Sequence, residues 1–233
     1  GFKPWIGAWR SWMTGCARMH SSLQTAQRRP YWGTVGSRVP HDYDHHACHA
    51  YYALFASPIR NDNTLIYTLD GGGDSTTSTL FRYMGGRVEE LARSNSVDIG
   101  RIYREVTLLL GMKTGEHEFK VMGMAPYGDK AKQKKIAEKI QNYLVSFDAK
   151  TGEFISNSSL KKFKKTLKKI YKNEKFEDIC AGVQFYIEKL ILDWVFYWAS
   201  KKKISNIAVS GGVFMNVKAT KKISELDIVD RFF

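Results

Sequence analysis

The distribution of apolar residues along the chain predicts alternating buried strands and helices. Two short runs, Thr64–Leu69 and Ile204–Val209, have the β-branched and aromatic content of strands buried within a sheet. The stretch from Phe176 to Ser200 is apolar around much of its circumference, which indicates a helix inside the core. A further helix is predicted from Asp98 to Leu110, because its apolar residues recur at helical spacing up to Gly111. Together these elements predict the α/β class.

Turn residues divide the remaining segments. Thr79–Met84 and Arg87–Leu91 flank two adjacent glycines and predict a β-hairpin, and another strand begins within Ile228–Phe233. Residues 115–128 contain too many glycines for one regular element. Residues 1–40 have no period of two or 3.6 and stay unassigned.

The net charge of +13 is concentrated in one segment. Residues 130–175 contain fourteen lysines and four acidic residues, and therefore carry most of the excess. The lysines alternate with apolar residues at helical spacing, which predicts amphipathic helices with a solvated lysine face, with a turn at Asp148–Gly152 between them. This segment lacks arginine, whose guanidinium group binds a phosphate through two parallel hydrogen bonds. Nucleic acid is therefore not expected as a partner.

The cysteines and the apolar runs indicate where in the cell the protein is expected to be. Three scattered cysteines form no disulfide framework, and this favours a reducing cytoplasm. No apolar run is long enough for a membrane span, and the first residues lack the layout of a signal peptide. We therefore expect a cytoplasmic protein without a membrane partner.

Residues 41–50 contain four of the six histidines. In a helix that begins near Asp44 and ends before Pro58, His45 and His49 lie one turn apart on the same face, whereas His46 points aside. Two imidazoles so placed can bind one metal ion, although clustered histidines are also common on polar surfaces. A zincin protease would need glutamate as its general base at position 46, so that class is disfavoured.

Two glycine-rich turns follow the predicted buried strands. In the first, Asp70 and Asp74 flank three glycines, a composition that suits a metal-bound phosphate but equally a hairpin with solubilising acids. In the second, Ser210–Asn216 is expected to open a helix, whose first amides favour an anion. Tight packing between strand and helix explains the second turn equally well. Glu116 and Lys120 lie beside a predicted loop, where Lys120 could neutralise a phosphate or simply be a surface residue.

Four blocks taken together resemble one family. They are His45–Ala50, Asp70–Asp74, Glu116–Gly128 and Ser210–Asn216, and as a set they are similar to the NodU/CmcH-type O-carbamoyltransferases over residues 41–233. The catalytic domain of that family resembles the TsaD-type protein of tRNA modification. The resemblance implies a ribonuclease-H-like or actin-like ATPase fold, with mixed sheets flanked by helices.

The resemblance also implies a reaction in two parts. Carbamoyl phosphate and ATP yield carbamoyl adenylate, and the carbamoyl group then passes to a hydroxyl of a small molecule or sugar. His45 and His49 would hold a divalent metal, iron being the first choice. The acceptor hydroxyl also needs a base, for which Asp74 and His46 are the candidates. The residues expected near the phosphates, the acceptor and the nucleotide are Asp70, Gly71, Gly72, Gly73, Glu116, Lys120, Ser210, Gly211, Gly212 and Asn216.

The chain also departs from the family. The initial strand and phosphate-binding turn of the family are not recognisable in residues 1–40, and the third metal ligand of the family, an aspartate, is expected beyond Phe233. We therefore expect 41–233 to be a partial TsaD-like domain with a lysine-rich insertion at about 130–175, lacking a C-terminal domain of the whole protein. Two alternatives stay open: a TsaD-like protein that acts on tRNA, and a non-catalytic module that binds a nucleotide or metal.

Overall fold

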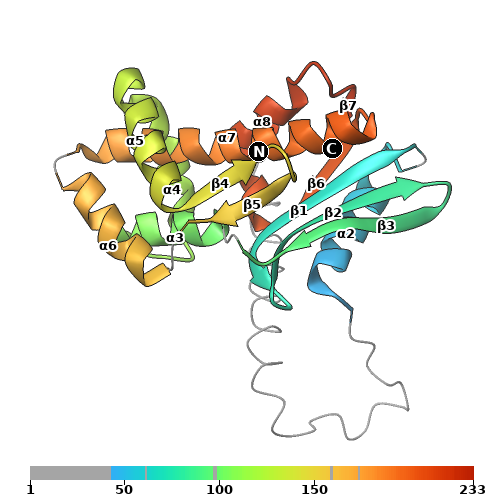
Figure 1. Ribbon diagram of the computed structural model, residues 1–233, viewed down its shortest axis with the longest axis horizontal. Helices are drawn as coiled ribbons and strands as arrows, with labels where there is room; N and C mark the ends of the chain where they lie inside the picture. The colour runs from blue at the N-terminus through green and yellow to red at the C-terminus, as the bar shows by residue number, and fades with distance from the viewer. Residues whose placement is uncertain (1–42, 61, 97–98, 158–159, 173) are drawn as a thin grey trace, which may run out of the picture. The chain divides into compact units, whose positions relative to one another are not determined.

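The structure is a computed structural model that describes residues 43–60, 62–96, 99–157, 160–172 and 174–233 (Figure 1). The unassigned segment 1–40 lies outside these residues. The strands are β1 Thr64–Gly73, β2 Thr76–Met84, β3 Arg87–Ser94, β4 Val145–Asp148, β5 Glu153–Ser156, β6 Asn206–Ser210 and β7 Arg231–Phe232. The helices are α2 His45–Ala56, α3 Ile99–Leu109, α4 Glu118–Met124, α5 Lys130–Tyr143, α6 Leu160–Tyr171, α7 Phe176–Lys202 and α8 Val217–Ser224, with short 3₁₀ helices η1 Ala125–Tyr127 and η2 Gly212–Met215.

A mixed five-stranded sheet organises the described residues, with the strand order β3-β2-β1-β6-β7. Strands β1, β2 and β3 form an antiparallel meander, whereas β6 pairs parallel with both β1 and β7. The predicted α/β class with a mixed sheet and flanking helices is thereby confirmed, as is the hairpin at the two adjacent glycines.

Strand β1 is buried on both faces because each face is covered by a helix. Leu65, Tyr67 and Leu69 belong to the core cluster that includes α7, and the Tyr67 hydroxyl donates to the Val195 carbonyl at 3.1 Å. Ile66 packs instead with Ala53 and other residues of α2. Successive side chains of a strand point to opposite faces of the sheet, so the continuous apolar run of β1 packs against α7 on one face and against α2 on the other.

Helix α7 is the longest element, at 27 residues, and it is core along most of its length as predicted. Its first half packs against α5 and α4 (Figure 1). Its second half reaches β1, where Trp194 meets Tyr67 edge to face. The lysine-rich helices are amphipathic as expected: Ile136 and Ile140 of α5 are buried while most of their lysine neighbours are exposed.

The turn at Asp148–Gly152 does not simply join two helices, as the sequence suggested. It is the tip of a small hairpin, β4–β5, which lies between α5 and α6 in the chain. The hairpin is held by aromatic side chains, since Phe154 packs on Trp194 and Phe147 packs on Tyr197. The predicted turn is therefore confirmed, but its two strands were missed, because strands of four residues are too short to show a clear period of two.

Residues 115–128 form the short helices α4 and η1, in keeping with the expectation that no single regular element spans them. No helix among the described residues is long and apolar enough to cross a membrane.

Candidate metal centre

Helix α2 begins at the histidine cluster because Asp44 caps it. The Asp44 carboxylate accepts a hydrogen bond from the Ala47 amide at 2.7 Å, and its other oxygen accepts from Arg93 at 2.9 Å. A carboxylate at this position satisfies a free amide of the first turn. The Asp74 carboxylate accepts from the His45 amide at 2.7 Å, which ties the start of the helix to the β1–β2 hairpin.

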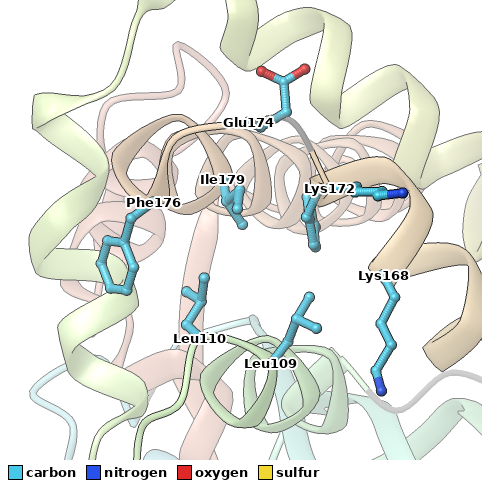
Figure 2. A pocket seen from close by; sticks show the side chains of 8 residues that line it. Leu109, Leu110, Lys168, Lys172, Glu174, Phe176 and Ile179 are labelled. Carbon is cyan, nitrogen blue, oxygen red and sulfur yellow. The ribbon is translucent and has the colours of Figure 1, made fainter.

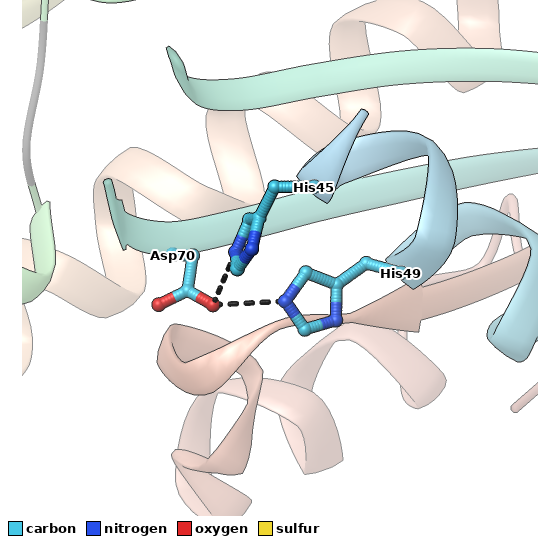
Figure 3. Close-up of side chains that lie close together, drawn as sticks. All are labelled: His45, His49 and Asp70. Carbon is cyan, nitrogen blue, oxygen red and sulfur yellow. Dashed lines mark hydrogen bonds and ion pairs between the residues drawn. The ribbon is translucent and has the colours of Figure 1, made fainter. Parts of the chain in front are cut away.

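His45 and His49 lie on one face of α2, as the spacing predicted, and both point at Asp70 (Figure 3). The Oδ2 atom of Asp70 is 3.3 Å from Nε2 of His45 and 2.9 Å from Nε2 of His49. One ligand atom from each residue lies within 4.8 Å of the others. The side chains are 34%, 21% and 27% exposed for His45, His49 and Asp70, so a small ligand can reach them.

The electrostatics of the trio favour the ionised forms of His45 and Asp70. The hydrogen bond to Asp70 raises the pKa of His45 in spite of partial burial. Burial alone would raise the pKa of Asp70, but hydrogen bonds from His45, His49 and the Gly71 amide outweigh it and place this pKa well below the ordinary value. Asp70 is therefore an anion at neutral pH, flanked by two nitrogen donors.

The second glycine turn lies against the trio. The Ser210 hydroxyl is 3.3 Å from Nδ1 of His49, and a methyl group added at Gly212 would lie 3.2 Å from Oδ1 of Asp70. Gly211 has φ of +105°, and a Cβ there would lie 2.2 Å from the Leu69 carbonyl oxygen. Only glycine allows β6 to leave the sheet so close to the end of β1.

The first glycine turn is a β-hairpin that also belongs to the site. Gly73 pairs with Thr76 in the β1–β2 ladder, and Asp74 lies exposed at the tip with a left-handed φ of 50°. Gly73 lies under the His45 ring, since an added Cβ would be 2.3 Å from its Cδ2 atom. Gly71 and Gly72 are exposed, with no atom within 4 Å of an added Cβ. The hairpin interpretation is therefore confirmed, and the hairpin contacts His45 of the trio.

His46 points away from the trio, as predicted, and is completely buried. Its Nδ1 lies 2.6 Å from the Thr68 hydroxyl, and its Nε2 lies 3.1 Å from the Thr76 carbonyl, to which it donates. Burial lowers the pKa of His46, so the neutral ring is favoured. With both nitrogens engaged between β1 and β2, His46 joins α2 to the sheet, and of the two proposed bases only Asp74 is exposed.

Three other predicted residues lie in different surroundings. Asn216 is buried: its side chain caps α8 through the Ala219 amide at 3.2 Å and donates to the Tyr103 hydroxyl at 2.7 Å. Glu116 pairs with Lys113. Lys120 is exposed on α4, which packs mainly on α3 and α7.

A buried polar network behind the second glycine turn was missed by the sequence analysis. The Gln184 amide nitrogen donates to Asn216 at 2.9 Å and to Glu188 at 2.6 Å, and Lys222 pairs with Glu188 at 2.6 Å. The signal that could have revealed it is the presence of Gln184 and Glu188, four residues apart, on an otherwise apolar helix. Buried polar groups of this kind are normally paired with one another.

Comparisons with known proteins identify a family for most of the chain. Residues 36–230 match the family described as the carbamoyltransferase N-terminus. The chain is similar to the nodulation protein NolNO of Sinorhizobium fredii, at 28% identity over 81% of this chain and 28% of the relative. It is also similar to an uncharacterized protein of Methanocaldococcus jannaschii, at 30% identity over 78% of this chain and 35% of the relative. A third relative is the nodulation protein NolO of Bradyrhizobium diazoefficiens, at 24% identity over 82% of this chain and 34% of the relative.

The chain spans about a third of the length of these curated relatives. The matched region contains the histidine helix, both glycine turns and four of the five strands of the main sheet, and only β7 lies beyond its end. On this match, the chain belongs to the carbamoyltransferase N-terminus family.

Proposed function

We propose that this domain takes part in ATP-dependent O-carbamoyl transfer. In the proposed reaction, carbamoyl phosphate, ATP and water give carbamoyl adenylate, phosphate and pyrophosphate. The carbamoyl group then passes to a hydroxyl of a small molecule or sugar, and AMP leaves. The proposal rests on one observation: His45 and His49, from the first two turns of α2, meet Asp70, from near the carboxyl end of β1, beside the Ser210–Gly212 turn. Ligands of α/β sheets commonly bind at the carboxyl ends of parallel strands, which is where this turn lies.

The donor set fits a divalent metal. Two imidazole nitrogens and one carboxylate oxygen, all partly exposed and within 4.8 Å of one another, suit borderline metals such as iron or zinc. His45, His49 and Asp70 would hold the ion, and the aspartate expected beyond Phe233 would be a further ligand. When bound, such an ion supplies Lewis acidity, which makes a phosphate a better leaving group.

The remaining groups of the chain have roles that follow from their positions. Ser210 fixes the His49 ring through Nδ1, so that Nε2 faces Asp70. We assign the nucleotide phosphates to the Ser210–Gly212 turn, which has no side chain at Gly211 or Gly212 to exclude them. Asp74, exposed at the hairpin tip, is our candidate for accepting the proton of the acceptor hydroxyl.

We further propose that the mixed sheet is one half of an actin-like ATPase fold. The antiparallel meander followed by parallel strands supports this assignment. The other half, and the domain that would form carbamoyl adenylate, would lie in the part of the relatives that this chain does not span.

The metal assignment is tested by elemental analysis of protein purified without chelator. Wild type is compared with His45→Ala and His49→Ala, and with His117→Ala as a matched control, because His117 lies outside the trio. We expect near-stoichiometric iron or zinc in the wild type and control, and loss of metal in both site variants. Metal retained in both site variants would contradict the assignment. So would its absence from wild type in a chain extended to the length of the relatives.

Transfer itself is tested on the extended chain with carbamoyl phosphate, ATP and a panel of hydroxyl compounds. AMP formation that depends on carbamoyl phosphate is the expected result. Nucleotide or metal binding without AMP formation would favour the non-catalytic module. Salt-dependent binding of tRNA would favour the tRNA-modifying alternative, because contacts with phosphates weaken as salt rises.

A further inference from the structure

Arg93, near the end of β3, connects three elements that meet at the start of α2. Its Nη1 atom donates to Oδ2 of Asp44 at 2.9 Å and to the Thr76 hydroxyl at 3.0 Å. Asp44 is the N-cap of α2, and Thr76 is the first residue of β2, directly after the tip of the β1–β2 hairpin. One guanidinium group therefore joins β3 to the first turn of the helix and to the hairpin.

Glu90 fixes the direction in which this guanidinium group points. Its two carboxylate oxygens accept from Nε and Nη2 of Arg93 at 2.9 Å and 2.7 Å, which is the bidentate geometry of an arginine–carboxylate pair. Because two of its three nitrogens are held by a residue of the same strand, Arg93 presents the third nitrogen to Asp44 and Thr76. A lysine has one nitrogen on a flexible chain and cannot reproduce this planar arrangement.

The groups around Arg93 hold the first turn of α2 at two amides. Oδ1 of Asp44, the second oxygen of the carboxylate that Arg93 contacts, accepts from the Ala47 amide at 2.7 Å. At the tip of the hairpin, Asp74 accepts from the His45 amide at 2.7 Å. The first amides of a helix have no partner within the helix, so these two bonds determine where α2 begins.

The position of this first turn decides where the candidate metal ligands point. His45 lies in the turn, and His49 lies one turn further along the same face of α2 (Figure 3). Their Nε2 atoms are 3.3 Å and 2.9 Å from Oδ2 of Asp70. Asp70 belongs to β1 and does not move with the helix. A shift or fraying of the first turn would therefore separate His45 from Asp70.

We propose that Arg93 is a positioning residue of the candidate metal centre. By holding the start of α2 against β3 and the hairpin, it directs His45 toward Asp70. The consequence for metal affinity rests on the proposed function, whereas the hold on the helix does not.

A role of Arg93 in stability alone predicts a different result. The side chains of Arg93 and Asp44 are 35% and 33% exposed, and ion pairs with this exposure add little to the stability of a fold. Loss of Arg93 is therefore expected to leave the domain folded. A change confined to the first turn of α2 and to metal affinity would identify positioning.

The charge of Arg93 acts on a bound cation in the opposite direction to its position. Arg93 contacts the residue next to His45, so its positive charge disfavours a cation at the trio. Loss of the charge alone would strengthen metal binding, whereas loss of the hold on α2 would weaken it. The sign of the change in affinity thus separates the two effects.

The test compares Arg93→Gln, which removes the charge and the planar contacts, with Arg93→Lys, which retains the charge. Arg82→Gln is the matched control within the sheet, because Arg82 of β2 forms the same kind of pair, with Glu89 of β3 at 2.6 Å. Lys168→Gln is the control for the loss of one positive charge. Lys168 lies exposed on α6, beside a hollow between α3, α6 and the start of α7 (Figure 2), and α6 packs on α5 and α3.

The first readout needs no metal. Amide hydrogen exchange of the metal-free chain, followed for each residue by NMR, reports the hydrogen bonds of the His45 and Ala47 amides. We expect exchange at these two amides to be about fivefold to tenfold faster in both Arg93 variants, the size of a weakened helix cap, and within about twofold of wild type in the two controls. Amides of β6 should exchange at the wild-type rate in all four variants.

The second readout is affinity for zinc, measured by calorimetric titration. Both Arg93 variants should bind zinc about tenfold more weakly than wild type, and both controls should stay within about twofold. The loss in Arg93→Lys is the more informative of the two, because this variant keeps the charge and changes only the contacts.

Unchanged exchange at both amides in Arg93→Gln would overturn the inference, whatever the affinity for zinc. Tighter zinc binding by Arg93→Gln would also overturn it, since the charge would then dominate. So would an equal loss of affinity in Arg82→Gln, because any pair within the sheet would then have the same effect. Absence of zinc binding to the wild-type chain, also when extended to the length of the relatives, would contradict the metal assignment alone. The exchange rates would still decide whether Arg93 holds α2.

Discussion

Replacement of Gly211 by alanine tests how closely β6 and β1 approach at the proposed site. The added Cβ would lie 2.2 Å from the Leu69 carbonyl oxygen and 2.8 Å from its carbon, and both are backbone atoms that cannot rotate away. The residue would also have to hold φ at +105°. This backbone strain costs about 1–3 kcal/mol, and the forced displacement of packed backbone costs about 1–3 kcal/mol more. We therefore expect Gly211→Ala to lower the free energy of unfolding by about 4 kcal/mol.

Two neighbouring glycines provide matched controls for the separate contributions. Gly72 has φ of +113° but nothing within 4 Å of an added Cβ, so Gly72→Ala should show the strain alone, at about 1–3 kcal/mol. Gly71 has neither a positive φ nor a close neighbour, and Gly71→Ala should change stability by no more than about 1 kcal/mol. The gain from restricting the unfolded chain is common to all three variants and cancels in the comparison.

The assay is urea denaturation followed by tryptophan fluorescence, since Trp194 and Trp198 are buried in α7. A loss of about 4 kcal/mol is a large part of the stability of a typical domain, about 5–15 kcal/mol. The variant should therefore unfold at clearly lower urea than the other two. Equal stability of Gly211→Ala and Gly72→Ala would refute the reasoning, because the approach of Gly211 to Leu69 would then impose no penalty.

Three further substitutions test other parts of the site and its surroundings. Gly73→Ala should displace the His45 ring, whose Cδ2 atom would lie 2.3 Å from the new Cβ, and weaken metal binding at least tenfold by titration while the circular dichroism spectrum stays native. Asn216→Ala should destabilise the domain by about 2–4 kcal/mol in thermal unfolding, because it removes a helix cap and the buried hydrogen bonds that Asn216 makes with Tyr103 and Gln184. Tyr171→Phe should leave the stability of the chain unchanged or raise it by about 1 kcal/mol, since the buried hydroxyl that it removes has no partner among the described residues. A clear drop in melting temperature would show that the hydroxyl is bonded.

The elements with a strong local pattern were predicted well from the sequence. The periodicity of α3 and α7, the apolar runs of β1 and β6 and the glycine pair between β2 and β3 all depend on contacts between near neighbours. The direction of the three imidazoles is equally local, because helix geometry alone places His45 and His49 together and turns His46 aside.

Only the tertiary structure decided which distant groups join the pair of histidines. Asp70 comes to His49 across 21 positions of the chain and Ser210 across 161. Both approaches depend on the register of β1 against β6 and on the face of the sheet that α2 covers, and no local pattern determines these. The same cause explains why Asn216, which lies in the same sequence block as Ser210, is buried in a network with Tyr103 and Gln184 instead. The histidine pair of the candidate metal site could thus be predicted from the sequence. The groups that join it, Asp70 and Ser210, were decided by strand pairing and helix packing between residues far apart in the chain.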